Sequence, residues 1–383
     1  MGEDTAGLLR EIASYRDRAP EDARMPPPEV YLSEELYEIE MDQVFRHEWI
    51  CVGREEQLPE PGDFFTIQIL EEPIVVVRGR DRELRALSNV CRHRYMKVAE
   101  DSGNARFFLC PYHKWSYNLD GKLRSAPGME GNRTFDAGHC ALPQFRLETW
   151  QGFVFVSLDE EISPLHERLR SASERCAEYD LGAWKTTAWY DEVWNGNWKL
   201  SCENGMDSYH HMGLHETTAE PCMPGLGTYF AEAHDHWNYH RTPILPDRAL
   251  ELGYDLKRLG DKMGLREEDR ACMNAVFIYP NLIFPVTPWS STWLSVLPID
   301  RTHSRIISGW SVPQAYLDDV DEEALRVESS EGLDKLNAED AQGTWRLQSV
   351  LDSRKIQRGP IGAKERAVFH FWRYMAGMLS ASA

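Results

Sequence analysis

Two pairs of cysteine and histidine constrain the fold of this chain more than any other feature. Cys91 and His93 form a Cys-x-His pair, Cys110 and His113 form a Cys-x2-His pair, and 16 residues separate the pairs. Each pair follows a predicted strand, so the four side chains come from two loop tips. Thiolate and imidazole ligands suit zinc or an iron–sulfur cluster. One cysteine and one histidine per loop favours a two-iron cluster, with two thiolates on one iron and two imidazoles on the other.

A second group of ligand-type residues lies between Asn195 and His215. Asp207, His210 and His211 precede His215 within a short segment. In a regular helix His211 and His215 share a face, whereas His210 and His215 point ~140° apart. Helix geometry alone therefore favours His211 as the partner of His215.

The order of strand and helix patterns predicts three regions. Residues 1–45 form an N-terminal arm with a helix, and residues 46–160 form a small antiparallel β domain of short strands. Residues 161–383 form a larger domain in which strands follow strands without regular crossover helices. The fold class is therefore α+β, with a curved antiparallel sheet in the larger domain.

Composition excludes several functions. The chain has 383 residues and a formal charge of −20, which repels nucleic acid and anionic lipid surfaces. No apolar run approaches the ~20 residues of a membrane span, and residues 1–10 lack a secretory signal, so we expect a cytoplasmic protein with no membrane partner. Eight cysteines are too sparse for a disulfide scaffold.

The motifs resemble those of the Rieske non-haem iron oxygenases, specifically the catalytic (alpha) component of ring-hydroxylating and choline-monooxygenase-like enzymes. The segment from Cys110 to Tyr117 is similar to the second loop of a Rieske [2Fe–2S] domain. Two positions depart from the family pattern: Lys114 stands where glycine is usual, and Arg94-Tyr95 stands where Arg-Gly is common. Neither change removes a ligand.

The second segment resembles the mononuclear-iron motif of the same family. Asp207, His210 and His215 fit Asp-x2-His-x4-His, and Asn-Trp-Lys and Glu-Asn precede them as in the family. The resemblance therefore selects His210 and His215 as iron ligands and leaves His211 as a bystander. Gly213 permits the break that brings both imidazoles together.

A facial triad on Fe(II) needs one carboxylate besides two histidines. The family places it in a C-terminal helix, in an acidic pair eight residues before a glutamine. Glu339-Asp340 and Gln348 match that pattern, so the resemblance implies Asp340 as the ligand. Glu339, Asp334 and Asp352 are rivals on the same charged stretch.

The resemblance also implies roles for neighbouring residues. Asp207 would bond to His210 and carry electrons from His113 of a neighbouring subunit, which implies a homotrimer. Asn204 would support the iron site. Cys91, His93, Cys110 and His113 would hold the cluster. A helix-grip fold, a curved antiparallel sheet with helices around the substrate, is expected for residues 161–383.

The implied function is that of a terminal oxygenase. It would use O2 and electrons from a ferredoxin or flavin reductase to hydroxylate or demethylate a small organic substrate, with aromatic compounds favoured. The chain itself has no dinucleotide-binding motif, and the basic residues of 91–115 are expected to attract an acidic donor. Six aromatic residues on the predicted strands could form a pocket wall, although large rings usually fill cores: Phe277, Tyr279, Phe284, Trp289, Trp293 and Trp310.

Three alternatives remain open from the sequence. An aromatic wall would also suit a quaternary ammonium, so a choline-, carnitine- or betaine-type monooxygenase or demethylase is the first alternative. An electron-transfer Rieske protein without oxygenase activity is the second. A zinc-stabilised interaction protein is the third, and it would give a colourless preparation.

Overall fold

The computed structural model describes residues 2–379 and divides into two compact units. The smaller unit is Phe45–Leu165, and the larger unit combines Met1–Val44 with His166–Ala383. Residues 2–44 belong to the larger unit; the N-terminal arm was expected over residues 1–45. Each unit is described by itself.

The smaller unit consists of two antiparallel sheets. The seven-stranded sheet has the order β1-β10-β9-β4-β3-β2-β5, and the three-stranded sheet has the order β6-β7-β8. Its strands are β1 (Ile50–Arg54), β2 (Asp63–Ile69), β3 (Glu72–Arg78), β4 (Leu84–Ser88), β5 (Ser102–Asn104), β6 (Phe108–Leu109), β7 (Ser116–Tyr117), β8 (Leu123–Ser125), β9 (Gln144–Trp150) and β10 (Phe153–Ser157). The loop after β4 carries Cys91 and His93, and the loop between β6 and β7 carries Cys110 and His113.

The larger unit is built on one antiparallel sheet of seven strands in the order β11-β17-β16-β15-β14-β13-β12. Its strands are β11 (Lys185–Trp194), β12 (Tyr229–Ala233), β13 (Trp237–Pro243), β14 (Cys272–Ile278), β15 (Leu282–Val286), β16 (Ser291–Asp300) and β17 (His303–Val312). Strands β12 to β17 follow one another along the chain, and β11 pairs with β17 at the edge. The predicted α+β class with a curved antiparallel sheet is confirmed.

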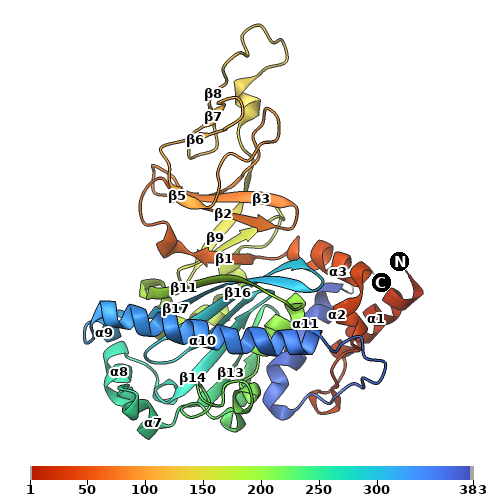
Figure 1. Cartoon of the computed structure of the whole chain (residues 1–383), viewed down its shortest axis with the longest axis vertical. Coiled ribbons are helices and arrows are strands. Elements are labelled where there is room, and N and C mark those ends of the chain that lie inside the picture. The colour runs from red at the N-terminus through yellow and green to blue at the C-terminus, as the bar shows by residue number, and fades with distance from the viewer. Residues whose placement is uncertain (1, 380–383) are drawn as a thin grey trace. The chain divides into compact units, whose positions relative to one another are not determined.

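Helices cover this sheet and close the unit, and α10 lies across it (Figure 1). The helices of this unit are α1 (Glu3–Ala13), α2 (Glu29–Leu32), α3 (Glu34–Glu40), α5 (Arg170–Cys176), α6 (Trp198–Gly205), α7 (Pro246–Glu251), α8 (Leu256–Met263), α9 (Gln314–Leu317), α10 (Glu322–Gln348) and α11 (Arg366–Leu379). The short helix α4 (Leu165–Arg168) lies at the boundary between the units. Asp321 starts α10 because its side chain accepts a hydrogen bond from the Ala324 amide. No helix within residues 2–379 has both the length and the hydropathy of a membrane span.

The N-terminal segment is joined to α6 by buried polar contacts. The Lys199 ammonium donates to Glu40 at 2.6 Å, and both side chains are fully buried. The Tyr31 hydroxyl and the Trp372 indole each donate to Glu203. These contacts fix α6, which precedes the histidine segment, against α3 and α11.

A regular helix does not run through the histidine segment. Helix α6 ends at Gly205, and a separate 3₁₀ turn, Tyr209–Met212, follows. Asp207 causes the separation because its Oδ1 accepts the backbone N–H of His210 at 2.8 Å, a local bond that competes with helix.

Candidate metal centres and the adjoining cavity

The two Cys/His loops of the smaller unit have the same backbone design. In each loop the cysteine N–H bonds to the carbonyl five residues later: Cys91 to Met96 and Cys110 to Trp115, both at 2.8 Å. The fifth residue of each loop, Tyr95 or Lys114, has a positive φ, 60° and 62°. These are the two positions at which the family pattern favours glycine. The turn is therefore kept although the glycine is not.

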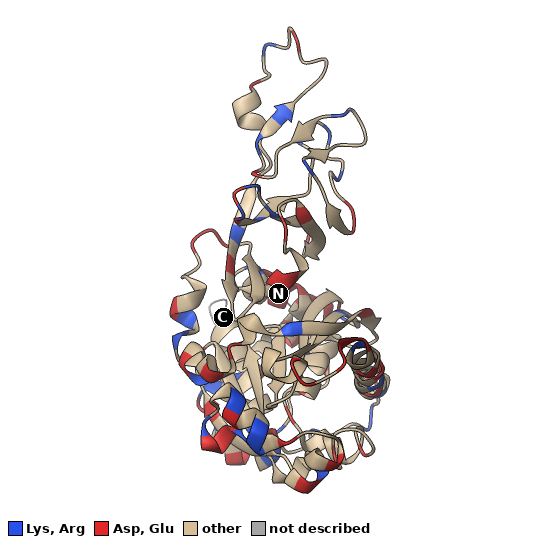
Figure 2. Cartoon of the chain, turned by 90° about the vertical axis from the view of Figure 1, so that its left-hand side faces the viewer, with Lys and Arg blue, Asp and Glu red and all other residues tan. Residues whose placement is uncertain are grey.

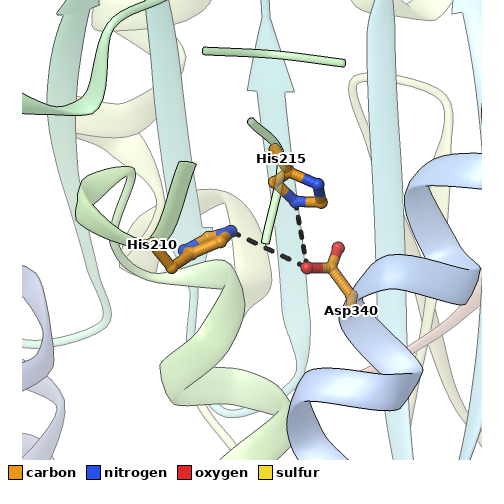
Figure 3. Close-up of side chains that lie close together, drawn as sticks. All are labelled: His210, His215 and Asp340. Atoms are coloured by element: carbon orange, nitrogen blue, oxygen red, sulfur yellow. Dashed lines mark ion pairs between the residues drawn. The ribbon is translucent and has the colours of Figure 1, made fainter. Parts of the chain in front are cut away.

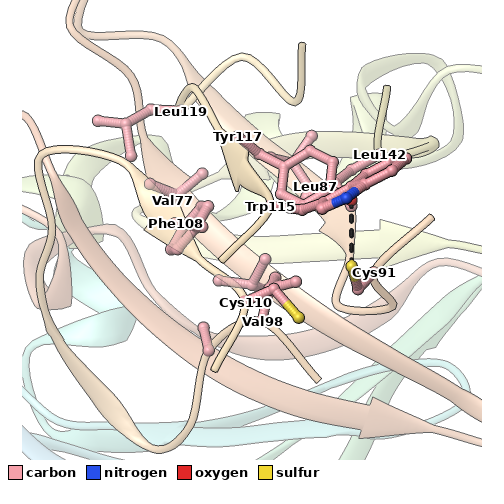
Figure 4. Close-up of a cluster of buried hydrophobic side chains, with 12 residues drawn as sticks. Val77, Leu87, Cys91, Val98, Phe108, Cys110, Trp115, Tyr117, Leu119 and Leu142 are labelled. Atoms are coloured by element: carbon pink, nitrogen blue, oxygen red, sulfur yellow. Dashed lines mark hydrogen bonds between the residues drawn. The ribbon is translucent and has the colours of Figure 1, made fainter. Parts of the chain in front are cut away.

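The four side chains of these loops lie together. Cys91 and Cys110 are buried in one cluster with Val98, Tyr117 and other apolar side chains (Figure 4). The neighbouring Cys91 thiol and burial together raise the pKa of Cys110, with burial the larger cause. The His93 and His113 rings lie 4.7 Å apart between centroids.

The donor atoms fit a two-iron cluster. The Nδ1 atoms of both His93 and His113 are buried and have no hydrogen-bond partner among residues 2–379. A buried, unpartnered ring nitrogen is costly unless it binds something, and here two such nitrogens accompany two adjacent thiols. The Tyr117 hydroxyl lies 3.3 Å from the Cys91 sulfur and accepts the Arg92 N–H at 3.0 Å. It therefore has its proton available for that sulfur.

In the larger unit, His210, His215 and Asp340 converge from the histidine segment and α10 (Figure 3). Their candidate ligand atoms all lie within 4.8 Å of one another. Asp340 Oδ1 is 3.0 Å from His215 Nε2 and 3.7 Å from His210 Nε2. These three residues could hold a metal ion.

The other ring nitrogen of each histidine is bonded to a carboxylate. His210 Nδ1 donates to Asp207 at 3.2 Å, and His215 Nδ1 donates to Glu339 at 2.7 Å. When Nδ1 carries the ring proton, the Nε2 atom of each ring faces the third carboxylate without a proton, and this is the tautomer that a metal requires. The donor set of two imidazoles and one carboxylate fits non-haem iron.

Asp340 is held as an anion. Burial raises its pKa, but its interactions with His215, His210 and Asn204 outweigh burial and leave the pKa below its usual value. The Asn204 amide donates to Oδ1 at 2.8 Å. The pKa of His215 is raised, because its contacts with Asp340 and Glu339 exceed the lowering effect of burial.

The other residues considered from the sequence do not join this group of ligand atoms. His211 Nδ1 bonds to the Met223 carbonyl at 3.0 Å, and burial lowers the pKa of His211 to about 3. Asp334 and Asp352 are exposed. Glu339, considered as a rival ligand, instead contacts His215 and accepts from Thr218 Oγ1 at 2.7 Å. No local sequence feature indicates this role, because it depends on a histidine from a distant segment.

A cavity of about 110 Å³ adjoins the three residues. Its sheet wall comes from alternate residues of three strands: Met273 and Ala275, Ile283 and Pro285, and Thr292 and Leu294. None of the six aromatic residues considered from the sequence is among its lining residues within 2–379. Phe284 and Trp293 have the opposite parity on their strands and are fully buried. These rings therefore do not form the wall of this cavity, and Phe284 and Trp293 fill the core, as large rings usually do.

Comparisons with known proteins agree with these two centres. Residues 48–146 match the model of the Rieske [2Fe-2S] domain, and residues 180–381 match that of the ring hydroxylating alpha subunit (catalytic domain). The two matches imply a Rieske cluster and a mononuclear iron in this chain.

Curated relatives include monooxygenase oxygenase subunits. A glycine betaine monooxygenase oxygenase subunit of Chromohalobacter salexigens is 31% identical over 62% of this chain and 58% of its own length. A carnitine monooxygenase oxygenase subunit of Escherichia coli K12 is 30% identical over 70% of this chain and 69% of its own length. The chloroplastic choline monooxygenase of Arabidopsis thaliana is 28% identical over 95% of this chain and 85% of its own length. The match to the first of these relatives thus spans less than two thirds of that protein.

Solved structures share the fold. A quaternary ammonium Rieske monooxygenase matches with a TM-score of 0.79 at 24% identity, over 94% of this chain and 96% of that chain. Naphthalene 1,2-dioxygenase from Rhodococcus sp. matches with a TM-score of 0.78 at 20% identity, over 100% of this chain and 99% of that chain. The catalytic-domain model covers more than half of the sequence, and the E. coli relative passes 30% identity over two thirds of its length. The chain is a member of the Rieske-type ring-hydroxylating oxygenases and corresponds to their catalytic (alpha) component.

Proposed function

We propose that this chain is the terminal oxygenase of a multicomponent system. Cys91, His93, Cys110 and His113 hold the [2Fe–2S] cluster, and His210, His215 and Asp340 hold the mononuclear iron. The observation that carries the proposal is that His210 Nε2 and His215 Nε2 face the carboxylate of Asp340 while each Nδ1 contacts another carboxylate. When bound, the cluster relays single electrons and the mononuclear iron activates dioxygen for insertion into a substrate.

The protein's own groups prepare the iron site. Asp207 and Glu339 fix the tautomer and the ring orientation of the two histidines. Asn204 holds the carboxylate of Asp340 in place. The apolar cavity excludes bulk water and holds the substrate beside the three ligands.

Metal and acid-labile sulfide analysis of anaerobically purified protein, with visible and EPR spectra, tests the assignment. About three irons and two sulfides per chain are expected. His210→Ala should lose about one iron and retain the cluster, whereas the matched variant His211→Ala should keep all of the iron. Two irons in the wild type and no loss in His210→Ala would leave an electron carrier without oxygenase activity. Zinc without sulfide would contradict both functions.

The electron donor is a ferredoxin or a flavin reductase that docks on the cluster loops. Five basic residues lie in residues 91–115 against two acidic ones, whereas acidic residues predominate over the whole chain (Figure 2). Arg94, Lys97 and Lys114 are exposed, and the Arg94 guanidinium lies 5.3 Å from the Tyr112 ring centroid. Positive charge around an electron-transfer site attracts an acidic partner and raises the association rate.

Charge reversal tests this docking surface. Arg94→Glu with Lys114→Glu should slow cluster reduction by a stopped-flow donor and weaken its dependence on ionic strength. Reversal of Lys122, an exposed lysine outside the two Cys/His loops, is the matched control. An unchanged rate in the double variant would exclude these loops as the docking site.

The active assembly is a homotrimer in which Asp207 bridges His210 to the cluster of a neighbouring subunit, so that electrons pass from that cluster to the mononuclear site. Asp207 supports this role because it is bonded to His210 and its side chain is partly accessible. A structure of a quaternary ammonium Rieske monooxygenase is described as revealing inter-subunit electron transfer. Co-expression of Cys110→Ala with Asp340→Ala tests the idea, because only transfer between subunits restores activity in mixed oligomers. Equal inactivity of the mixed and single-variant oligomers would contradict it.

The reaction is hydroxylation or oxidative demethylation of a small organic substrate. Aromatic compounds are one substrate class. Quaternary ammonium compounds are the other, since the named relatives act on glycine betaine, carnitine and choline. Oxygen uptake coupled to product formation, measured with both classes, distinguishes them.

A further inference from the structure

The cavity beside His210, His215 and Asp340 has an aliphatic wall. Strands β14 to β16 and helix α10 supply it, and α10 contributes Leu333 and Leu336. Because an aromatic face is the usual neutral partner of a quaternary ammonium, a cage for such a cation needs rings that this lining lacks within residues 2–379. Aliphatic side chains do not compensate a cation for the hydration free energy that it loses on entering the cavity.

The charged groups of the cavity are already engaged. Asp207 is bonded to His210, and Asp340 is bonded to His215 and Asn204. The lining residues within 2–379 include no other carboxylate and no lysine or arginine. A ligand with a permanent charge therefore finds no counter-ion in this wall beyond the groups that form the metal site.

One donor in the wall has no partner. Asn337 is 2% exposed and lines the cavity one helical turn before Asp340 on α10. Its Nδ2 is buried and makes no hydrogen bond with any described residue. An unsatisfied buried donor costs about 1–3 kcal/mol, so such a group in a ligand cavity indicates a site for an acceptor.

Ser201 is the other lining residue with an unpartnered buried polar atom among those described. Its hydroxyl can donate or accept, so it sets no requirement on the ligand. The Asn337 Nδ2 group can only donate, so it requires a ligand with a hydrogen-bond acceptor.

We propose that this cavity takes an uncharged, largely apolar molecule that carries a hydrogen-bond-accepting oxygen, and that Asn337 positions this oxygen. The inference rests on the proposed function, since it names the substrate class of the same site. A neutral substrate would distinguish this chain from its named relatives, whose names indicate quaternary ammonium substrates.

Two matched ligand pairs test the chemistry by calorimetry on the iron-loaded oligomer without dioxygen. Choline and 3,3-dimethylbutan-1-ol differ in a quaternary nitrogen against a quaternary carbon, and anisole and ethylbenzene differ in an ether oxygen against a methylene. The neutral alcohol should bind at least about tenfold more tightly than choline, and anisole more tightly than ethylbenzene. Choline binding as tightly as the alcohol, or no binding of either neutral oxygen ligand, would overturn the proposal.

Variants of Asn337 separate binding from structure. Asn337→Leu should lower the affinity for anisole about tenfold, leave that for ethylbenzene unchanged, and not lower the thermal midpoint, because it removes an unsatisfied donor. Asn337→Ala checks that the larger side chain does not merely fill the cavity. The control Asn281→Leu removes an amide that donates to Ser295 Oγ at 3.0 Å outside the cavity, so it should lower the midpoint and spare affinity. A lowered midpoint with unchanged anisole affinity in Asn337→Leu would make Asn337 a structural residue and overturn its positioning role.

Failure of the proposed function gives a different result. Nitric oxide added to the anaerobic protein yields an EPR signal only if the mononuclear iron is bound. Absence of that signal contradicts the metal site and with it the proposed function. Presence of the signal together with a failed ligand comparison contradicts only the inference about the cavity.

Discussion

His215 connects two adjacent carboxylates of α10: its Nε2 lies 3.0 Å from Asp340 Oδ1, and its Nδ1 donates to Glu339 Oε2 at 2.7 Å. The two carboxylates therefore have different roles although they are neighbours in sequence. One faces the metal position together with His210. The other fixes the ring that faces the same position.

Substitution of these neighbours should separate the two roles. Asp340→Ala should abolish mononuclear iron binding, because it removes the anionic ligand atom. Glu339→Gln should weaken iron binding by about 10–100-fold, as is typical when an outer partner of a ligand is lost. Iron titration followed by EPR measures both variants, and the exposed Asp334→Ala serves as the control. Equal iron loss in Glu339→Gln and Asp340→Ala would contradict the assignment.

Asn204 is expected to set the position of Asp340 without binding the metal. Asn204→Leu removes the 2.8 Å bond to Oδ1 and keeps a side chain of similar volume. Iron affinity should fall by about 10–100-fold while the cluster spectrum stays unchanged. Asn204→Gln, which retains an amide, should bind iron more tightly than the leucine variant. The opposite order would show that the amide is dispensable.

Much of the site was predictable because its motifs are local. The spacing of Cys91, His93, Cys110 and His113 indicates two loops, and the backbone bonds show both loops with the same turn. The role of Glu339 depends on a histidine from a distant segment, so no local pattern reveals it. The segment after α6 shows the same limit, because the Asp207 side chain ends the helical pattern through a bond to His210.

The cavity wall shows a second limit. Residues of β15 and β16 can be assigned to strands from the sequence, but which face meets the cavity depends on register. Ile283 and Leu294 face the cavity. Phe284, which follows Ile283, and Trp293, which precedes Leu294, pack on the other side of the sheet. A shift of one residue exchanges the faces of a strand, so residue type alone cannot tell which set of side chains meets the cavity.

The Tyr117 hydroxyl should raise the reduction potential of the cluster. It lies 3.3 Å from the Cys91 sulfur, and a hydrogen bond to a ligand sulfur stabilises the reduced, more negative state. Tyr117→Phe should lower the potential by about 40 mV for a bond worth about 1 kcal/mol. Redox titration followed by visible spectra measures the shift. An unchanged potential would show that the hydroxyl does not bond to the cluster.

Lys114 should lower the stability of the smaller unit and speed its reduction by an acidic donor. Its φ of 62° is a left-handed conformation that costs a non-glycine residue roughly 1 kcal/mol. Lys114→Gly should therefore raise the thermal midpoint of the smaller unit, and it should slow reduction by an acidic donor because a positive charge is lost. Lys114→Ala is the control, since it loses the charge and keeps most of the strain. A midpoint for the glycine variant below that of the alanine variant would contradict this account.

Glu203 should make the stability of the larger unit depend on pH. Burial raises the pKa of Glu203 from 4.5 to about 8, although Tyr31, Trp372 and Lys199 oppose this effect. Between these two values the unfolded chain has lost the proton while the folded protein retains it. The free energy of unfolding should therefore fall as pH rises through this window, by at most about 1.4 kcal/mol per pH unit.

Urea denaturation of wild type and Glu203→Gln at pH 5, 6, 7 and 8 measures this contribution. Glutamine keeps acceptors for Tyr31 and Trp372 and cannot ionise, so its curve should be flatter across the window. Other titrating groups contribute equally to both proteins and cancel in the difference. Because only the wild type carries the ionisable group, the free energy of unfolding of the variant relative to that of the wild type should increase toward pH 8. Parallel curves would mean that Glu203 ionises with the same pKa in the folded and unfolded states, which its burial between α6 and α11 argues against.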